Sequence, residues 1–62
     1  MQTQPLVSII IRTKNEERWI KLCLDKIYEQ SYKNFEIIIV DNYSTDKTLQ
    51  KIKNYKIKKI LK

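Results

Sequence analysis

The sequence predicts an α/β fold in which a parallel sheet is built in the order strand, helix, strand, helix, short strand. Two short runs rich in β-branched residues, at 6–11 and 35–40, are typical of buried strands. Each run is followed by a polar turn and then by a segment with apolar residues at helical spacing. Strands that alternate with helices in this way indicate βαβ units, whose strands run parallel.

The first unit starts with the strand L-V-S-I-I-I at 6–11. Asn15 is then a favourable N-cap, and Glu16 and Glu17 follow it in the first helical turn, where acidic side chains complement the helix dipole. Four apolar residues at i, i+3, i+4 and i+7 form one face of a helix that we expect to end near Gln30. These residues are Ile20, Cys23, Leu24 and Ile27.

The second unit starts with the strand at 35–40, and a loop at 41–43 follows it. We expect Ser44 or Thr45 to cap the second helix, because hydroxyl side chains accept the free N–H groups of a first turn. Asp46 then lies in that first turn, where its charge complements the helix dipole.

The second helix carries Leu49 and Ile52 on one face and should fade near Asn54. The remaining segment, K-I-K-K-I-L-K at 56–62, is interpreted as a third short strand, with a frayed helical tail as the alternative. No repeat or flexible linker divides the chain, so residues 1–62 form one small domain. A domain of this size buries only about 60% of its unfolded surface, so its stability should be marginal.

Positive charge is concentrated in the second half of the sequence. The chain has 62 residues and a formal charge of +6, and from Lys47 onward there are seven lysines and no acid. A basic segment of this kind can bind nucleic acid, an anionic lipid surface or a phosphate-bearing ligand. The alternative is a set of solvated lysines on the outer faces of a helix and a strand.

Missing residue types exclude several kinds of site. The chain has no glycine, which excludes the glycine-rich turns that bind dinucleotides and nucleoside triphosphates. It has no histidine and one cysteine, Cys23, which argues against the usual zinc sites. We expect Cys23 to be a small buried thiol in a reducing compartment. The start of the chain lacks a basic signal-peptide segment, and its apolar run is too short to span a membrane. We therefore expect a cytoplasmic protein, with the inner face of the membrane as an alternative location.

Polar residues follow both long strands at the point where each strand ends. R-T-K-N at 12–15 follows the first strand, and D-N at 41–42 follows the second. Because ligands of open parallel sheets bind beyond the carboxyl ends of the strands, we expect one crevice there, beside two helix N-termini that suit an anion. Structural roles are the alternatives. Asp41 can brace its own loop, residues 44–46 can serve mainly as caps, and Glu16 can act through the helix dipole.

Three segments resemble family 2 glycosyltransferases, which have the GT-A fold. They are V-S-I-I-I-R-T-K-N-E-E at 7–17, Q-S-Y-K-N-F-E-I-I-I-V-D-N at 30–42 and S-T-D-K-T at 44–48. The resemblance implies that residues 1–62 are a single partial domain, the N-terminal Rossmann-like part of a nucleotide-diphospho-sugar transferase fold.

The resemblance also implies a nucleotide-binding site. In the family, the loop after the first strand lies beside the base and ribose of a nucleotide-sugar donor, usually a UDP-sugar, and the acidic pair after the second strand meets the base. Asn42 takes the position that often carries an acid contacting a uracil N–H, and its carbonyl oxygen can accept that bond without charge. Arg12 and Lys14 replace the commoner proline and tyrosine, which weakens the case for base stacking and favours phosphate. The implied nucleotide-binding residues are Arg12, Thr13, Lys14, Glu16, Asp41 and Asn42.

The family's reaction needs groups that this sequence does not contain. The D-x-D motif that holds Mg or Mn against the diphosphate, and the acid that acts as catalytic base, both lie downstream of the matched region in the family. The sequence has no D-x-D and no acid after Asp46. We therefore expect this chain to provide no catalytic residue, no metal ligand and no bound cofactor, and to be inactive alone, with Mg or Mn used by the full-length family. The donor sugar and the acceptor are not specified by these residues.

One face of the sheet should remain uncovered. Right-handed crossovers place both helices on the same face, whereas the runs at 9–11 and 37–40 are apolar on both faces. About five or six aliphatic side chains would stay exposed, each forgoing roughly 1.5–3 kcal/mol of burial. The expected partners are the nucleotide-sugar donor and, over the open face, the remainder of the transferase domain or a second copy of the chain.

The rival interpretation is a small basic module that binds nucleic acid or an anionic membrane through residues 47–62. It leaves the motifs at the strand ends unexplained, which makes nucleic acid an unfavoured partner.

Overall fold

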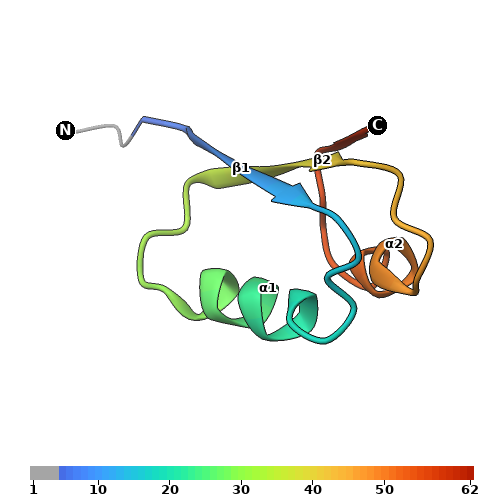
Figure 1. The fold of residues 1–62 in the computed structure, drawn as a ribbon. Coiled ribbons are helices and arrows are strands. Elements are labelled where there is room, and N and C mark those ends of the chain that lie inside the picture. The colour runs from blue at the N-terminus through green and yellow to red at the C-terminus, as the bar shows by residue number, and fades with distance from the viewer. Residues whose placement is uncertain (1–4) are drawn as a thin grey trace, which may run out of the picture.

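The computed structural model describes residues 5–62, and its elements follow the predicted order (Figure 1). Strands alternate with helices along the whole described chain, as the two apolar runs indicated. The elements are β1 (Val7–Thr13), α1 (Ile20–Glu29), β2 (Phe35–Asp41), α2 (Thr48–Ile52) and β3 (Lys59–Leu61). The predicted α/β class is therefore confirmed, and residues 56–62 contribute a strand rather than a helical tail.

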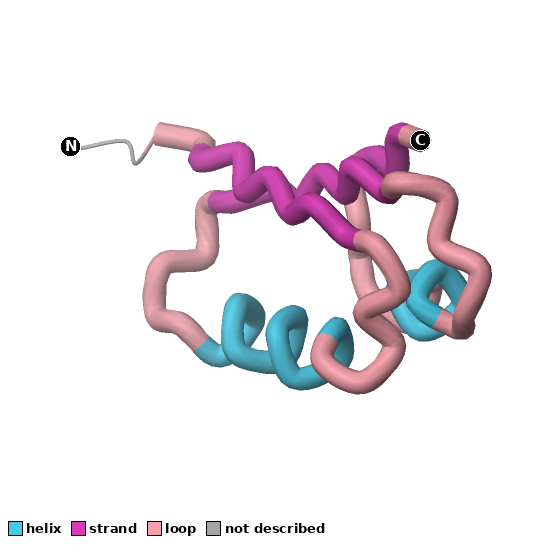
Figure 2. The backbone as a smooth tube through the Cα atoms, viewed as in Figure 1, coloured by secondary structure: helices cyan, strands magenta, loops and turns pink. Residues whose placement is uncertain are grey.

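The sheet is fully parallel, and β2 lies between β1 and β3. β1 and β2 pair in register over their whole length, from Val7 opposite Phe35 to Thr13 opposite Asp41. Both strands reach one or two residues further than predicted, because the polar residues Thr13 and Asp41 still belong to the ladder. The two long strands end side by side, so the loops that follow them leave the sheet at the same edge (Figure 2).

Both helices pack against one face of the sheet, as right-handed crossovers require (Figure 1). The core lies between these two layers and contains Ile20 and Leu24 from α1, Ile37 and Ile39 from β2, and Ile52 from α2, each 2% exposed or less. Successive side chains of a strand point to opposite faces, so every second residue of β2 enters this core.

The opposite face of the sheet is not covered by any element within residues 5–62 (Figure 1). Ile10 pairs with Ile38, and Val40 pairs with Leu61, so these four side chains share that face. Ile10 is 63% exposed and Leu61 is 41% exposed. The predicted open face is confirmed, with four aliphatic strand residues rather than five or six.

The start of α1 differs from the prediction. The helix begins at Ile20 and has neither a side-chain cap nor an acid in its first turn. Glu16 precedes it in a turn, where the Glu16 carbonyl accepts the N–H groups of Trp19 at 2.9 Å and Ile20 at 2.8 Å. Asn15 adopts a left-handed backbone with φ 51°, and its side chain bonds to the other loop instead of capping α1. The prediction of Asn15 as an N-cap was wrong because tertiary bonds use its side chain.

The start of α2 also differs from the prediction. The Asp46 carboxylate accepts the Thr48 N–H at 2.9 Å, and Asp46 lies two residues ahead of the helix that starts at Thr48. Ser44 and Thr45 bond to Asp41 and Asn15 instead. Lys47 takes the N-cap position of α2, which has no side-chain cap, so the prediction of Ser44 or Thr45 as the cap was wrong.

Cys23 is exposed, so its predicted burial was wrong. It lies one step round α1 from the buried Leu24, on the flank beside the edge strand β1, where it lines a small cavity with Ile11 and Trp19. Trp19, one turn earlier on the same flank, is 60% exposed. Within the described chain no strand lies beyond β1 to cover this flank.

Candidate functional site

A cavity of about 550 Å³ lies where β1 and β2 end. It is lined by all six residues of the predicted site, and by two more that the sequence did not indicate. The lining residues are Arg12, Thr13, Lys14, Glu16, Val40, Asp41, Asn42 and Lys62. Residues that are far apart in the sequence meet here because the parallel strands pair in register and end together.

Two of the six predicted residues are turned into the protein. Thr13 is 4% exposed and Asp41 is 1% exposed, because in this register both side chains point toward the helices. The Asp41 carboxylate accepts three hydrogen bonds: from the Thr13 hydroxyl at 2.6 Å, the Ser44 hydroxyl at 2.6 Å and the Ser44 N–H at 2.8 Å. This is the bracing role that the sequence left open for Asp41.

The Asp41 carboxyl is held in its ionised form. Burial raises its pKa, but the hydrogen bonds from Ser44 and Thr13, together with the positive charge of Lys62, more than offset this and leave the pKa below its ordinary value. The site therefore contains a buried negative charge that is already paired within the protein.

The remaining predicted residues are open to a ligand. Arg12, Lys14 and Asn42 are exposed, and Glu16 is half-buried. The Asn42 N–H donates to the Thr13 carbonyl at 2.9 Å, which fixes the Asn42 backbone at the rim of the cavity. The cavity thus offers cationic side chains for a phosphate and one amide group that can both donate and accept hydrogen bonds.

The two loops of the site are bonded to each other. The Asn15 N–H donates to the Ser44 hydroxyl at 2.9 Å, and the Asn15 side-chain oxygen accepts the Thr45 N–H at 2.8 Å. The Glu16 N–H donates to the Thr48 hydroxyl at 2.8 Å. The S-T-D-K-T motif at 44–48 therefore holds the first loop in place, a role that sequence reasoning missed because capping explained the same residue types.

These bonds change the electrostatic origin of the site. We expected free N–H groups at the helix N-termini to suit an anion, but the N–H groups of Glu16 and Glu17 donate to Thr48 and Asp46. That expectation was wrong. The positive charge at the cavity comes from side chains instead, and Lys62, which the sequence alone did not single out, adds to Arg12 and Lys14.

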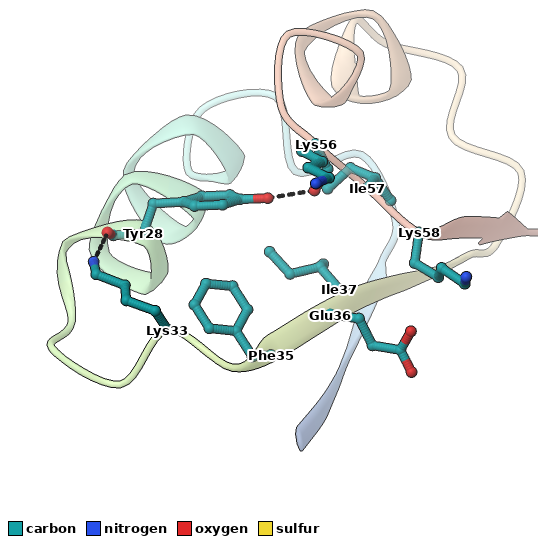
Figure 3. A pocket seen from close by; sticks show the side chains of 8 residues that line it. All are labelled: Tyr28, Lys33, Phe35, Glu36, Ile37, Lys56, Ile57 and Lys58. Carbon is teal, nitrogen blue, oxygen red and sulfur yellow. Dashed lines mark hydrogen bonds between the residues drawn. The ribbon is translucent and has the colours of Figure 1, made fainter. Parts of the chain in front are cut away.

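A second cavity, of about 540 Å³, lies at the opposite edge of the sheet (Figure 3). The Tyr28 hydroxyl crosses it to the Lys56 carbonyl, and the Lys33 ammonium group donates to the Tyr28 carbonyl at 2.8 Å. Its apolar wall is formed by the core residue Ile37 and by Tyr28, Phe35 and Ile57, which pack against the core. This cavity is an open end of the core, and it shares no residue with the predicted site.

Among residues 5–62 there is no group of three or more His, Cys, Asp or Glu side chains that could hold a metal ion. In the same part of the chain, no helix has the length and apolar character needed to cross a membrane.

Comparison with known proteins gives a consistent result. The family model for glycosyl transferase family 2 matches residues 8–62. The chain is similar to the dolichyl N-acetyl-alpha-D-glucosaminyl phosphate 3-beta-D-2,3-diacetamido-2,3-dideoxy-beta-D-glucuronosyltransferase of Methanococcus voltae, with 53% identity over 49 residues, 76% of this chain and 15% of the relative. It is also similar to the putative glycosyltransferase EpsE of Bacillus subtilis, with 44% identity over 55 residues, 89% of this chain and 20% of the relative. A PGL/p-HBAD biosynthesis glycosyltransferase of Mycobacterium tuberculosis is 47% identical over 45 residues, 73% of this chain and 18% of the relative.

The chain therefore spans a fifth or less of the length of these relatives. The family model, in contrast, covers β2, β3, both helices and all of β1 except its first residue. With its two strand-end motifs assembled around one cavity, the chain belongs to glycosyl transferase family 2.

Proposed function

We propose that this chain forms the nucleotide-binding part of a sugar transferase that uses a nucleotide-sugar donor, with a UDP-sugar as the first candidate. The observation that carries the proposal is the convergence of Arg12, Lys14 and Asn42 on one cavity at the carboxyl ends of β1 and β2. Ligands of open parallel sheets bind at this edge. Family membership supports sugar transfer as the reaction of the whole protein.

The exposed side chains suit the two halves of a nucleoside diphosphate. Arg12, Lys14 and Lys62 bring three positive charges to the cavity, which complement a diphosphate. The Asn42 side-chain oxygen can accept the N3–H of uracil, and its NH₂ group can donate to a neighbouring carbonyl. Glu16, half-buried beside them, can accept a hydrogen bond from a ribose hydroxyl.

Transfer to an acceptor hydroxyl also needs a base and, with a diphosphate leaving group, a cation such as Mg²⁺ or Mn²⁺ that neutralises the developing charge. The cavity does not fit such a cation. The Asp41 carboxylate already accepts three hydrogen bonds, and Glu16 is the one other carboxylate in the lining, beside three cationic side chains. We propose that the cation ligands and the base belong to parts of the transferase other than residues 5–62.

Calorimetric titration with UDP tests this function. We expect weak, millimolar binding, which Lys14→Ala weakens by roughly threefold to tenfold through the loss of one phosphate contact. Lys33→Ala is the matched control, because it removes the same charge at the opposite cavity. Equal effects of the two variants would show that UDP responds to the net charge and not to this site.

The basic-module alternative is tested in the same way with a short DNA duplex. Binding through phosphate charge falls steeply between 50 and 200 mM salt, by about a thousandfold for six contacts. A duplex that binds much more tightly than UDP at low salt, with that steep salt dependence, would favour the basic module.

A further inference from the structure

Asp41 is the most completely bonded polar side chain of the site. Its carboxylate accepts the Thr13 hydroxyl, the Ser44 hydroxyl and the Ser44 N–H, and the side chain is 1% exposed. Its two hydroxyl donors are themselves fixed, because Thr13 is paired with Asp41 in the sheet and the Ser44 hydroxyl accepts the Asn15 N–H. No ligand can reach this carboxylate without breaking several of these bonds.

These bonds determine where Asn42 lies. The bond from the Ser44 N–H to Asp41 closes a tight turn, and Tyr43 within that turn has a left-handed backbone with φ 52°. The Asn42 N–H, in turn, donates to the Thr13 carbonyl. Asn42 thus lies between Thr13 and Ser44, and the Asp41 carboxylate bonds to both of these residues. The exposed Asn42 side chain is therefore held at the rim of the cavity.

We propose that Asp41 is a positioning residue, which contacts no part of the nucleotide and acts by placing Asn42 as the group that reads the base. The proposal rests on the proposed function. The resemblance assigns Asp41 and Asn42 together to the base. Here they have different roles, because Asp41 is buried and Asn42 is exposed.

Paired nucleotides separate positioning from direct contact. The probes are UDP and N3-methyl-UDP, which lacks the N3–H of uracil. We expect the unaltered chain to prefer UDP by about tenfold, the effect of one lost hydrogen bond. Asn42→Ala should abolish this preference. Asp41→Asn should weaken UDP more than N3-methyl-UDP and so lower this preference, because it displaces Asn42, and it should leave the ratio unchanged when Asn42 is already alanine.

A preference for UDP that stays unchanged in Asp41→Asn, or that Asn42→Ala keeps, would overturn the positioning role and leave the proposed function intact. No binding of UDP by the folded, unaltered chain would instead overturn both. The two failures are therefore distinguishable in one set of titrations.

Ser44→Ala serves if Asp41→Asn fails to fold. It keeps the Asp41 charge and removes one of its donors, so positioning predicts a smaller preference for UDP over N3-methyl-UDP and a shifted Asn42 amide signal. An Asn42 signal and nucleotide affinities that both stay unchanged in Ser44→Ala would contradict the proposal.

Discussion

Asn15 shows how one side chain can determine the shape of a site that it does not line. Its left-handed backbone turns the chain after β1, and its side-chain oxygen accepts the Thr45 N–H from the loop after β2. Asparagine suits this position because it tolerates a positive φ and carries a short acceptor.

Two substitutions at Asn15 separate these contributions. Asn15→Gly keeps the backbone freedom and loses the side-chain bond, and should lower the free energy of unfolding by about 1 kcal/mol. Asn15→Ala loses the bond and adds the cost of a left-handed backbone, a further 1 kcal/mol or so. Urea unfolding measures both. Equal stability of the two variants would show that alanine at position 15 avoids the cost of a positive φ.

Acid should destabilise the chain through its buried carboxylate. The pKa of Asp41 is lowered in the fold, so its contribution is fully present above the ordinary Asp pKa of about 3.9 and is lost as the pH falls through the lower folded-state value. The pKa values of Asp46 and Asp25 are lowered as well, the latter by the Tyr55 hydroxyl and Lys21. We predict that the urea midpoint falls less steeply below about pH 5 in Asp41→Asn than in the unaltered chain. Part of the fall should remain, because Asp25 and Asp46 also contribute to it. An unchanged pH profile would exclude a contribution from Asp41.

At the level of elements, strands were easier to predict than helix ends. The runs of isoleucine fix β1 and β2 because β-branched residues fit a buried sheet, and both ladders were found within two residues of their predicted bounds. The helix starts were misplaced because Asn15 and Ser44 bond to the opposite loop. Capping preferences are local, and they cannot indicate that a partner some 30 residues away uses the same atoms.

The helix face of α1 was predicted correctly for Ile20 and Leu24 but not for Cys23. A four-residue apolar stripe gives the direction of a helix face but not its width, which here depends on the sheet ending at β1. We predict that Cys23 in the folded chain reacts with Ellman's reagent at close to its rate in urea. If Cys23 reacts much more slowly in the folded chain than in urea, its thiol is buried after all.

For the molecule as a whole, the site was predictable because it depends on topology rather than on local geometry. Parallel neighbours ending together bring Arg12, Lys14 and Asn42 to one cavity whatever the details of the turns. The inward orientation of Asp41 and Thr13 was not predictable, because a one-residue change of register would reverse it. Lys62 was missed because the sequence did not fix where β3 ends relative to β2.

The open face should make the isolated chain associate. Ile10→Thr, at an exposed position of that face, should reduce self-association with little loss of stability, whereas Ile39→Thr in the core should cost roughly 2–4 kcal/mol. Sedimentation and urea unfolding measure the two effects. A chain that stays monomeric at high concentration, with or without Ile10→Thr, would contradict this role of the face.

An amide NMR titration of the folded chain with millimolar UDP tests whether the loops after β1 and β2 form one nucleotide site. We predict that the signals of Thr13, Asp41 and Asn42 shift together and saturate, while those of Lys33 and Lys58 at the opposite edge stay in place. If UDP moves none of the first three signals, or moves both edges alike, the site is not where the two strands end.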